Sequence, residues 1–396
     1  MHLNKNLQKL VSAAQKEEKL GIGLMSGTSL DGLDIALCRF KGHGIETEFE
    51  LVEFMTIPYS EDFKAEVQSV FAKRDADLEK VCLLNAYIGN FHGDLVLEAL
   101  AQWDIKPAAI DFMASHGQTI YHAPKRLHLQ DGYPNATLQI GDGDQLAVKT
   151  GILTISDFRQ KHIAAGGEGA PLALYGDVIL ASKQGENRIL LNIGGIANLT
   201  FLPVDGDYRK ILCTDIGPGN TLIDAASRKY FDLPYDEDSK IAFSGKVNDS
   251  LLEALLDHPF FAEPAPKTTG PELFNLAYVE KALQAAGITA IDNEDLVSTL
   301  SAFTARSIVE FVLKNIRVDG IKIFTSGGGA KNKFVISYLK SALPKAVIGN
   351  TADLGINPDA KEAILFALLG NEALCGEPLA IGNNPAVLMG KFSFPL

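Results

Sequence analysis

Cysteine is scarce in this chain, and its placement excludes several classes of protein. The four cysteines do not have the spacing of a zinc site or of a disulfide framework. Three of them lie in apolar runs typical of strands or helices, so we expect buried thiols and a reducing, cytoplasmic compartment. The four residues are Cys38, Cys82, Cys213 and Cys375.

Long hydrophobic runs are also lacking. No segment reads as the run of about 20 apolar residues that a membrane-spanning helix needs, so we expect no membrane partner. Residues 1–19 carry lysines and glutamates without a continuous apolar stretch, which argues against a signal peptide. We interpret them as an N-terminal extension that contains a short amphipathic helix.

An excess of positive charge is the third absence. The 396 residues have a formal net charge of −13, so nothing in the overall charge would neutralise a nucleic-acid backbone, and we expect no nucleic-acid partner. A small phosphorylated ligand remains compatible with this charge, because a cleft can be locally positive. The length is sufficient for two domains of ordinary size.

Strands and helices alternate along the chain, which predicts an α/β fold. A three-strand opening with a glycine turn occurs near residue 20 and again near residue 190. This approximate duplication favours two similar lobes around a cleft, although glycine hairpins are common and the repeat could be a coincidence. We place lobe I at residues 20–155, completed by residues 370–396, and lobe II at residues 156–369.

Two turns of small residues carry an aspartate after a short apolar run. Residues 26–32 (SGTSLDG) follow the first run, and residues 214–220 (TDIGPGN) follow the second. Glycines let a backbone approach an anion closely, and an aspartate can hold Mg²⁺ or accept a proton. The first turn reads either as a phosphate cradle with Asp31 near the metal, or as an ordinary hairpin. Asp215 reads either as a general base at a strand end or as a helix-capping residue.

Two further glycine segments fit a nucleotide. Residues 192–198 (NIGGIAN) can clamp phosphate or form a bulged turn, and residues 326–332 (SGGGAKN) join a strand to a helix. Three consecutive glycines cost backbone entropy on folding, so a plain loop rarely needs them, and we favour a ligand. The adenosine or the α-phosphate would lie there.

Polar clusters elsewhere suit a hydroxyl-rich ligand, because such ligands need donors and acceptors at fixed places. They lie at residues 115–119 (SHGQT), 156–159 (SDFR) and 266–272 (PKTTGPE), and a glycine-rich loop spans residues 164–171. Each has a structural alternative: His116 could be a buried core histidine, and Asp157 and Arg159 could share one face of a strand. The segment around Lys267 is by itself only weak evidence for a substrate or phosphate contact.

Taken in order, these segments resemble the anhydro-N-acetylmuramic acid kinase family. The resemblance covers about residues 20–390 and is carried by several motifs together. They are residues 23–32, 115–119, 157–159, 169–172, 191–195, 215–220 and 267–270.

The resemblance implies the two-lobed sugar kinase/heat-shock-70/actin fold, related to ribonuclease H, with ATP in the cleft and a requirement for Mg²⁺. It also implies a reaction in which 1,6-anhydro-N-acetylmuramic acid, ATP and water give N-acetylmuramic acid 6-phosphate and ADP, during peptidoglycan recycling. It further suggests a homodimer.

Residue roles follow from the motifs and from this resemblance. Asp215 is the expected base, and Asp31 the expected Mg²⁺ ligand. The residues expected at ATP and its phosphates are Ser26, Gly27, Thr28, Ser29, Asp31, Gly32, Asn192, Gly194, Gly195, Gly217, Gly219, Gly327, Gly328, Gly329 and Asn332. Those expected at the sugar are His116, Thr119, Asp157, Arg159, Lys267 and Glu362.

Some positions depart from the family pattern. His162 stands where an aspartate is usual, Glu168 stands where a glutamine is usual, and residues 1–19 have no counterpart in that pattern. Two other functions stay open. The first is another sugar or carboxylate kinase of the same fold, and the second is a nucleotide-dependent binding or assembly protein.

Overall fold

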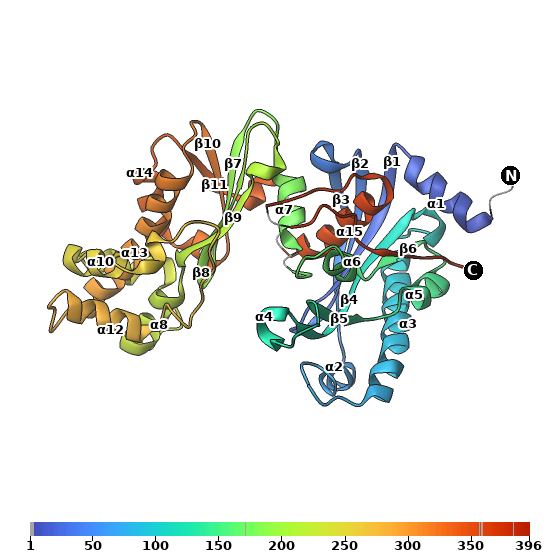
Figure 1. Ribbon diagram of the computed structural model, residues 1–396, viewed down its shortest axis with the longest axis horizontal. Coiled ribbons are helices and arrows are strands. Elements are labelled where there is room, and N and C mark those ends of the chain that lie inside the picture. The colour runs from blue at the N-terminus through green and yellow to red at the C-terminus, as the bar shows by residue number, and fades with distance from the viewer. Residues whose placement is uncertain (1–3, 171, 356, 358, 383) are drawn as a thin grey trace. The chain divides into compact units, whose positions relative to one another are not determined.

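The computed structural model describes residues 4–170, 172–355, 357, 359–382 and 384–396. Two compact units make up the chain (Figure 1). Unit 1 contains Met1–Leu180 and Ile356–Leu396, and unit 2 contains Ala181–Gly355. Each unit is built on its own sheet, so each is described by itself.

Unit 1 has a seven-stranded sheet in the order β12-β6-β4-β1-β2-β3, with β5 paired to β4. β1, β2 and β3 form an antiparallel meander, and β4 and β6 run parallel to β1 and β4 respectively. The strands are β1 (Glu18–Ser26), β2 (Gly32–Lys41), β3 (Glu48–Pro58), β4 (Phe112–Ala123), β5 (Ala136–Ile140), β6 (Thr154–Ser156) and β12 (Lys391–Ser393). The helices are α1 (Lys5–Gln15), α2 (Glu61–Gln68), α3 (Leu78–Gln102), α4 (Lys125–His128), α5 (Gly143–Thr150), α6 (Phe158–Ala164), α7 (Ala173–Ala181) and α15 (Lys361–Cys375).

Unit 2 has a five-stranded sheet in the order β11-β10-β7-β8-β9. β7, β8 and β9 form the antiparallel meander, and β10 and β11 continue the sheet in parallel. The strands are β7 (Asn187–Ile193), β8 (Ile196–Leu202), β9 (Leu212–Pro218), β10 (Ile321–Ser326) and β11 (Val347–Asn350). The helices are α8 (Thr221–Phe231), α9 (Lys240–Ser244), α10 (Asp249–Leu256), α11 (Pro259–Ala262), α12 (Leu276–Ala285), α13 (Asn293–Asn315) and α14 (Lys333–Ala342).

The two sheets share one topology. In each, a three-strand meander is followed by two parallel strands added beside its first strand, so the spatial orders are β3-β2-β1-β4-β6 in unit 1 and β9-β8-β7-β10-β11 in unit 2, with β5 outside this order. This is the ribonuclease H-like lobe, and its occurrence twice is the duplicated arrangement of the actin-like ATPases. The α/β class, the duplication and the fold expected from the sequence are confirmed.

The boundary between the units differs from the expected one. Residues 156–180 and the helix α15 belong to unit 1, not to the unit that contains residue 200. α15 lies directly against β1, β2 and β4. Small residues allow this approach, since a Cβ on Gly23 would lie 1.9 Å from the Ala363 carbonyl oxygen. The helix α1, expected within the N-terminal extension, also contacts α15, so the N-terminal segment is part of unit 1.

The cysteines are less buried than expected. Cys38 is buried, Cys375 is half-buried, and Cys82 and Cys213 are exposed. The expectation was wrong for the exposed pair because an apolar run on one face of a helix or strand still has residues on its outer side.

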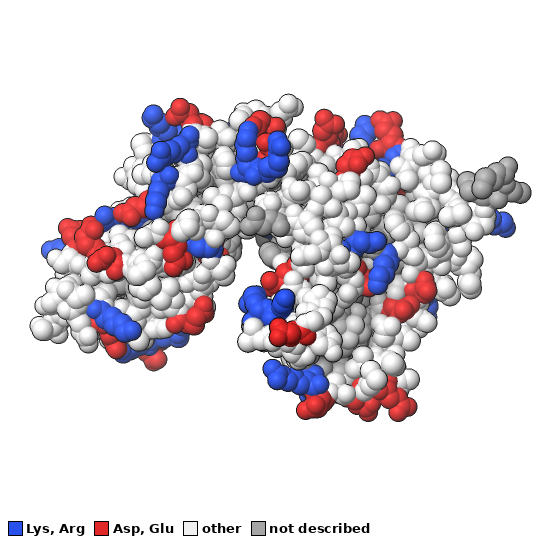
Figure 2. All heavy atoms as spheres, in the orientation of Figure 1, with Lys and Arg blue, Asp and Glu red and all other residues white. Residues whose placement is uncertain are grey.

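On the face drawn in Figure 2, acidic and basic side chains are interspersed.

The helix α13 is apolar because it is the core helix of unit 2. Among the described residues it alone is long and apolar enough to cross a membrane, but 83% of its most apolar window is buried. It contacts α8, α9, α10, α14 and β9, all within unit 2. Burial on all sides accounts for its hydropathy.

Candidate active site

The nucleotide motifs of unit 2 lie at one edge of its sheet. β7 and β10 are parallel, with Asn192 opposite Ser326, and β9 runs in the same direction as β7. The loops that follow these three strands therefore lie at a common edge, which is where open α/β sheets bind their ligands. These loops carry Gly194-Gly195, Gly219 and residues 327–329.

The first two of these loops are tied together by backbone hydrogen bonds. Gly219 N–H donates to the Gly195 carbonyl, and Asn220 N–H donates to the Gly194 carbonyl, both at 2.8 Å. Thr304 Oγ1 donates to the Gly219 carbonyl at 2.7 Å. A Cβ on Gly219 would lie 2.2 Å from the Gly194 oxygen, so this position requires glycine. Gly219 thus shapes the phosphate turn and does not offer its amide to a ligand.

The triple glycine contacts the end of β7. Gly327 has φ +78°, and a Cβ there would lie 2.7 Å from Asn192 Oδ1. A Cβ on Gly329 would lie 2.3 Å from the Ile193 side chain. Within the described residues, neither Gly195 nor Gly327 uses its amide in a hydrogen bond, and both glycines are exposed. These amides are suited to an anion.

Asn332 has a structural task that the sequence did not reveal. Its Oδ1 accepts from Val335 N–H at 3.0 Å, as the N-cap of α14, and from Ser239 Oγ at 2.8 Å. The side-chain oxygen is therefore committed to the protein, and a nucleotide contact through Oδ1 is not supported.

The sequence predicted Asp215 at the end of a strand. In the structure it lies inside β9. The β8–β9 pairing changes register between Ala197 and Asn198, which faces Asp215. Such bulges redirect a side chain and occur next to active sites. Thr269 N–H donates to Asp215 Oδ2 at 2.9 Å. Burial raises the pKa of the half-buried Asp215 carboxyl, and the Thr269 hydrogen bond opposes part of that rise.

Lys267 supports Asp215 through its backbone. Asp215 N–H donates to the Lys267 carbonyl at 3.0 Å, and Lys267 N–H donates to Thr214 Oγ1 at 2.9 Å. The ammonium group donates to the Phe260 carbonyl and lies 4.1 Å from the centre of the Phe260 ring. The structure thus directs this side chain into the aromatic core of unit 2, which argues against the expected contact with the sugar.

The first glycine turn follows β1 in unit 1, and its residues divide into two groups. Ser26 is buried, and its hydroxyl donates to Gln118 Oε1 and accepts from the Tyr59 hydroxyl. Gly32 is buried against the Ile57 carbonyl, 2.5 Å from where a Cβ would be. Thr28, Ser29 and Asp31 are exposed. The exposed residues can meet a ligand, whereas Ser26 and Gly32 hold the turn in place.

Carboxylates near this turn suit a divalent cation. Burial raises the pKa of the Asp34 carboxyl, and the charges of Asp359 and Asp31 raise it further. A cation bound beside Asp34 would favour the ionised form of its carboxyl. Among the described residues, no three His, Cys, Asp or Glu side chains form a metal site. A cation at Asp31 would therefore complete its shell with water and phosphate oxygens, as Mg²⁺ usually does.

His116 and Arg159 form a connected pair in unit 1. The strand β4 includes residues 115–119, and its register against β1 changes at His116 and Gly117. Arg159 Nε donates to His116 Nε2 at 3.1 Å, and its Nη1 donates to the Gly169 carbonyl at 2.7 Å. Burial, followed by the Arg159 charge, lowers the pKa of His116 to about 3. The imidazole is neutral and can accept the Arg159 hydrogen bond.

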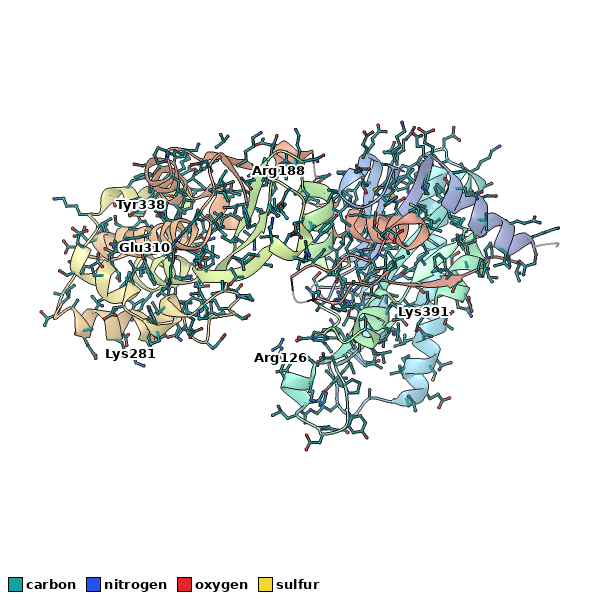
Figure 3. All side chains as sticks on the ribbon, turned by 45° about the horizontal axis from the view of Figure 1, so that its top comes forward. Arg126, Arg188, Lys281, Glu310, Tyr338 and Lys391 are labelled. Atoms are coloured by element: carbon teal, nitrogen blue, oxygen red, sulfur yellow. The ribbon has the colours of Figure 1, made fainter. Side chains whose placement is uncertain are left out.

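The remaining candidates for sugar contacts in unit 1 are Glu362, Thr119 and Asp157. The charge of Glu362, in the first turn of α15, raises the pKa of Arg159 against the effect of burial. Thr119 Oγ1 accepts from Gln139 Nε2 at 3.1 Å. Asp157 follows β6 with φ +56° and forms an ion pair with Lys391, which is labelled in Figure 3. That ion pair occupies one oxygen of Asp157, so its role is at least partly structural.

His162 and Glu168, the two residues that depart from the family pattern, both hold the glycine-rich loop in place. His162 Nδ1 accepts from Gly169 N–H at 2.9 Å, and a Cβ on Gly167 would lie 2.3 Å from the His162 ring. Glu168 accepts from Arg126 Nε at 3.2 Å, and Figure 3 labels Arg126 on α4. Both residues therefore anchor the glycine-rich loop whose Gly169 carbonyl orients Arg159.

Arg159→Lys tests the pair. A lysine has no fork with which to reach both His116 Nε2 and the Gly169 carbonyl. We expect the KM for the sugar to rise about tenfold, because one charged hydrogen bond is worth roughly that factor, while the KM for ATP stays unchanged. Steady-state kinetics with each substrate varied in turn measures both constants. An unchanged KM for the sugar would show that Arg159 does not bind it.

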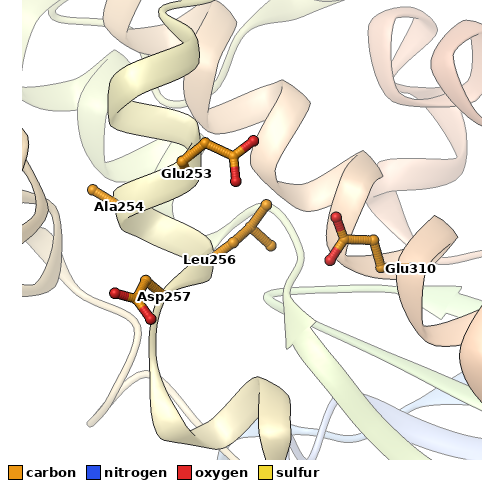
Figure 4. A pocket seen from close by; sticks show the side chains of 5 residues that line it. All are labelled: Glu253, Ala254, Leu256, Asp257 and Glu310. Carbon is orange, nitrogen blue, oxygen red and sulfur yellow. The ribbon is translucent and has the colours of Figure 1, made fainter.

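A hollow of about 510 Å³ lies elsewhere in unit 2, between α10 and α13 (Figure 4). Its lining includes Glu253, Asp257 and Glu310, and Arg306 bridges the two glutamates at 2.6 and 2.8 Å. An acidic lining repels phosphate, and none of the predicted site residues lies there. This hollow is not the candidate nucleotide site.

Sequence comparison is consistent with this geometry. A family model described as anhydro-N-acetylmuramic acid kinase matches residues 19–390. A relative of that name from Pseudoalteromonas atlantica is 51% identical over 99% of this chain and 100% of its own length, and one from Caldanaerobacter subterraneus is 39% identical over 98% and 100%. Coverage of 99% shows that most of residues 1–19, expected to be an extension, is shared with the first relative.

Solved structures found by fold comparison are remote. The ROK hexokinase from Thermus thermophilus has a TM-score of 0.35 and 11% identity, over 89% of this chain and 97% of its own. That likeness is too low to support an argument about the site.

Proposed function

The chain belongs to the anhydro-N-acetylmuramic acid kinase family, and on that basis we propose that it opens 1,6-anhydro-N-acetylmuramic acid with water and transfers the γ-phosphoryl group of ATP to O6. The products are N-acetylmuramic acid 6-phosphate and ADP, in peptidoglycan recycling. The observation that carries the proposal is the match over residues 19–390, which includes Asp215 at a bulge beside the nucleotide loops of unit 2.

Asp215 is the general base in this proposal. Water must lose a proton as it attacks the anomeric carbon, while O6 leaves that carbon and attacks phosphorus. Thr269 N–H holds one carboxylate oxygen of Asp215, which leaves the other oxygen to accept the proton. The raised pKa of the carboxyl makes it a stronger base than an ordinary aspartate.

Exposed groups of each glycine system are assigned to the phosphates, each unit being considered by itself. In unit 2 these are the amides of Gly195 and Gly327, and in unit 1 they are the turn residues Thr28 and Ser29. Asp31 would hold Mg²⁺, which neutralises charge on the transferring phosphoryl group. His116, Arg159 and Glu362 orient the sugar.

The oligomeric state, the cellular compartment and the partners are inferred from the family. We propose a homodimer in the cytoplasm, with ATP and the anhydro sugar as its small-molecule partners and with no nucleic-acid or membrane partner.

The test is ADP release from Mg·ATP by the purified protein, with and without the anhydro sugar. Glucose, N-acetylglucosamine and N-acetylmuramic acid serve as comparison sugars. We expect ADP release with the anhydro sugar alone and a 6-phosphate product. In ¹⁸O-water the label should appear at C1 of the product, because water opens the ring. Turnover without label at C1 would contradict the hydrolytic step, and release with none of the sugars would contradict the substrate.

A further inference from the structure

A chain of buried polar side chains connects the middle of α3 to the glycine turn after β1. His92 Nε2 lies 2.9 Å from the Tyr59 hydroxyl, which lies 2.7 Å from Ser26 Oγ, and Ser26 Oγ contacts Gln118 Oε1. All four side chains are buried, with relative exposures between 0% and 4%. Most buried polar side chains in proteins are hydrogen-bonded, and these four are bonded to one another in series.

The direction of each hydrogen bond follows from the backbone at one end. Gln118 Nε2 lies 3.3 Å from the Gly27 carbonyl and 3.2 Å from the Thr119 carbonyl, and only an amide NH₂ can donate to both. The Gln118 oxygen therefore faces Ser26 and must accept. The Ser26 proton points to Gln118, so Ser26 Oγ can only accept from Tyr59.

The same reasoning determines the tautomer of His92. The single proton of Tyr59 goes to Ser26, so the Tyr59 oxygen accepts from His92 Nε2–H. Burial lowers the pKa of His92 to about 3, so the imidazole is neutral and carries its one proton on Nε2. The other nitrogen, Nδ1, is then an acceptor, and it has no partner among the described residues.

The direction of these hydrogen bonds determines what Ser26 can contribute to the glycine turn. Ser26 has no proton left for a phosphate group, although it stands in the motif that suggested a phosphate contact. Ser26 is instead connected through Gln118 to Gly27, whose carbonyl accepts from Gln118 Nε2. The exposed residues Thr28 and Ser29 follow immediately.

We propose that Tyr59 and His92 are positioning residues that set the orientation of the phosphate turn after β1 through Ser26 and Gln118. The inference rests on the proposed function for the identity of the ligand, Mg·ATP. Both side chains are buried, with relative exposures of 4% for Tyr59 and 0% for His92. The sequence offered no signal for either, because Tyr59 follows a strand and His92 lies in the apolar middle of a long helix.

The first variant is Tyr59→Phe, which keeps the ring that packs 4.3 Å from the Phe63 ring and removes the donor to Ser26. We expect the KM for ATP and the Kd for Mg·ADP to rise about tenfold, the usual effect of removing one buried hydrogen-bond partner. The KM for the sugar should not change. Calorimetric titration of Mg·ADP measures the affinity without any turnover.

Two further variants separate positioning from folding. Tyr59→Phe leaves His92 Nε2–H unpaired, so Tyr59→Phe/His92→Leu removes both groups and avoids that cost. Tyr87→Phe is the matched control, because Tyr87 belongs to the same aromatic cluster, 6.0 Å from the Phe91 ring, and is 48% exposed. The double variant should remain folded and keep the weakened nucleotide affinity, whereas the control should bind like the wild type.

Nitrogen-15 NMR of the histidine rings gives a second readout. We expect His92 to be neutral and protonated on Nε2 throughout the neutral pH range. Protonation on Nδ1, or equal Mg·ADP affinity in the double variant and the control, would overturn the proposal. A wild-type protein that binds Mg·ADP but does not turn over the anhydro sugar would contradict the proposed substrate and leave this binding test intact.

Discussion

Asp215→Asn is expected to lower turnover by about 100- to 10,000-fold, the range for loss of a general base. The variant keeps the hydrogen bond from Thr269 N–H, because the asparagine carbonyl can accept it in place of Asp215 Oδ2. It cannot accept a proton from water. Affinity for ATP should therefore remain, and steady-state kinetics together with nucleotide titration would separate the two effects.

The same variant is expected to be at least as stable as the wild type at neutral pH. Burial raises the folded-state pKa of Asp215 above its unfolded value. A carboxyl with a raised pKa contributes stability below its unfolded pKa, and this contribution is lost as the pH rises through the folded pKa. At neutral pH the buried charge is a net cost, which asparagine removes. Thermal unfolding at neutral and acidic pH would show this as a gain at neutral pH only.

Asp224→Asn is the matched control for this prediction. Asp224 lies on α8 in the same unit, is half-buried, and also has a pKa raised by burial. We expect it to keep its turnover. The assignment of Asp215 as the base would be refuted by normal turnover in Asp215→Asn, or by equal losses in both variants.

Gly219→Ala is expected to have the largest effect on stability. The added Cβ would lie 2.2 Å from the Gly194 carbonyl oxygen and 3.1 Å from that of Gly195. Both neighbours are backbone atoms of the β7–β8 hairpin, so relief requires the hairpin and the turn after β9 to separate. That separation breaks the 2.8 Å bonds from Gly219 and Asn220. Overpacking against atoms that cannot rotate away costs about 3 kcal/mol.

Urea unfolding would measure this loss, and titration with Mg·ADP would measure the accompanying loss of affinity. Gly328→Ala is the control for stability, since its nearest neighbour would be Asn220 Nδ2 at an ordinary 3.5 Å. Similar unfolding midpoints for the two alanine variants would show that the close approach at Gly219 does not hold the loops together.

Several features of the fold could be predicted from the sequence. The alternation of strand-like and helix-like patterns predicted the α/β class. The duplicated meander was predicted from two glycine turns about 170 residues apart, because local turn chemistry is written in the residues themselves. The position of β12 could not be predicted, because three residues (Lys391–Ser393) carry too little pattern.

The roles of single side chains depended on contacts between distant segments. Ser26 looked like a phosphate ligand until Tyr59 and Gln118 were placed against its hydroxyl. Lys267 looked like a sugar contact until its ammonium was placed against Phe260. A motif states which chemical group is present, but not which partner already uses that group.

The sequence by itself determined the fold class, the family and the identity of the loops that carry chemistry, since these depend on local patterns of glycine, aspartate and apolar residues. Tertiary structure alone decided which of those groups remain available. The bulges at His116 and Asp215, the short path from His92 to Ser26 and the close approach at Gly219 all arise where separate strands, turns and helices pair or pack. Burial and hydrogen bonding at these contacts set the pKa of each group and decide which of its donors and acceptors remain available to a ligand.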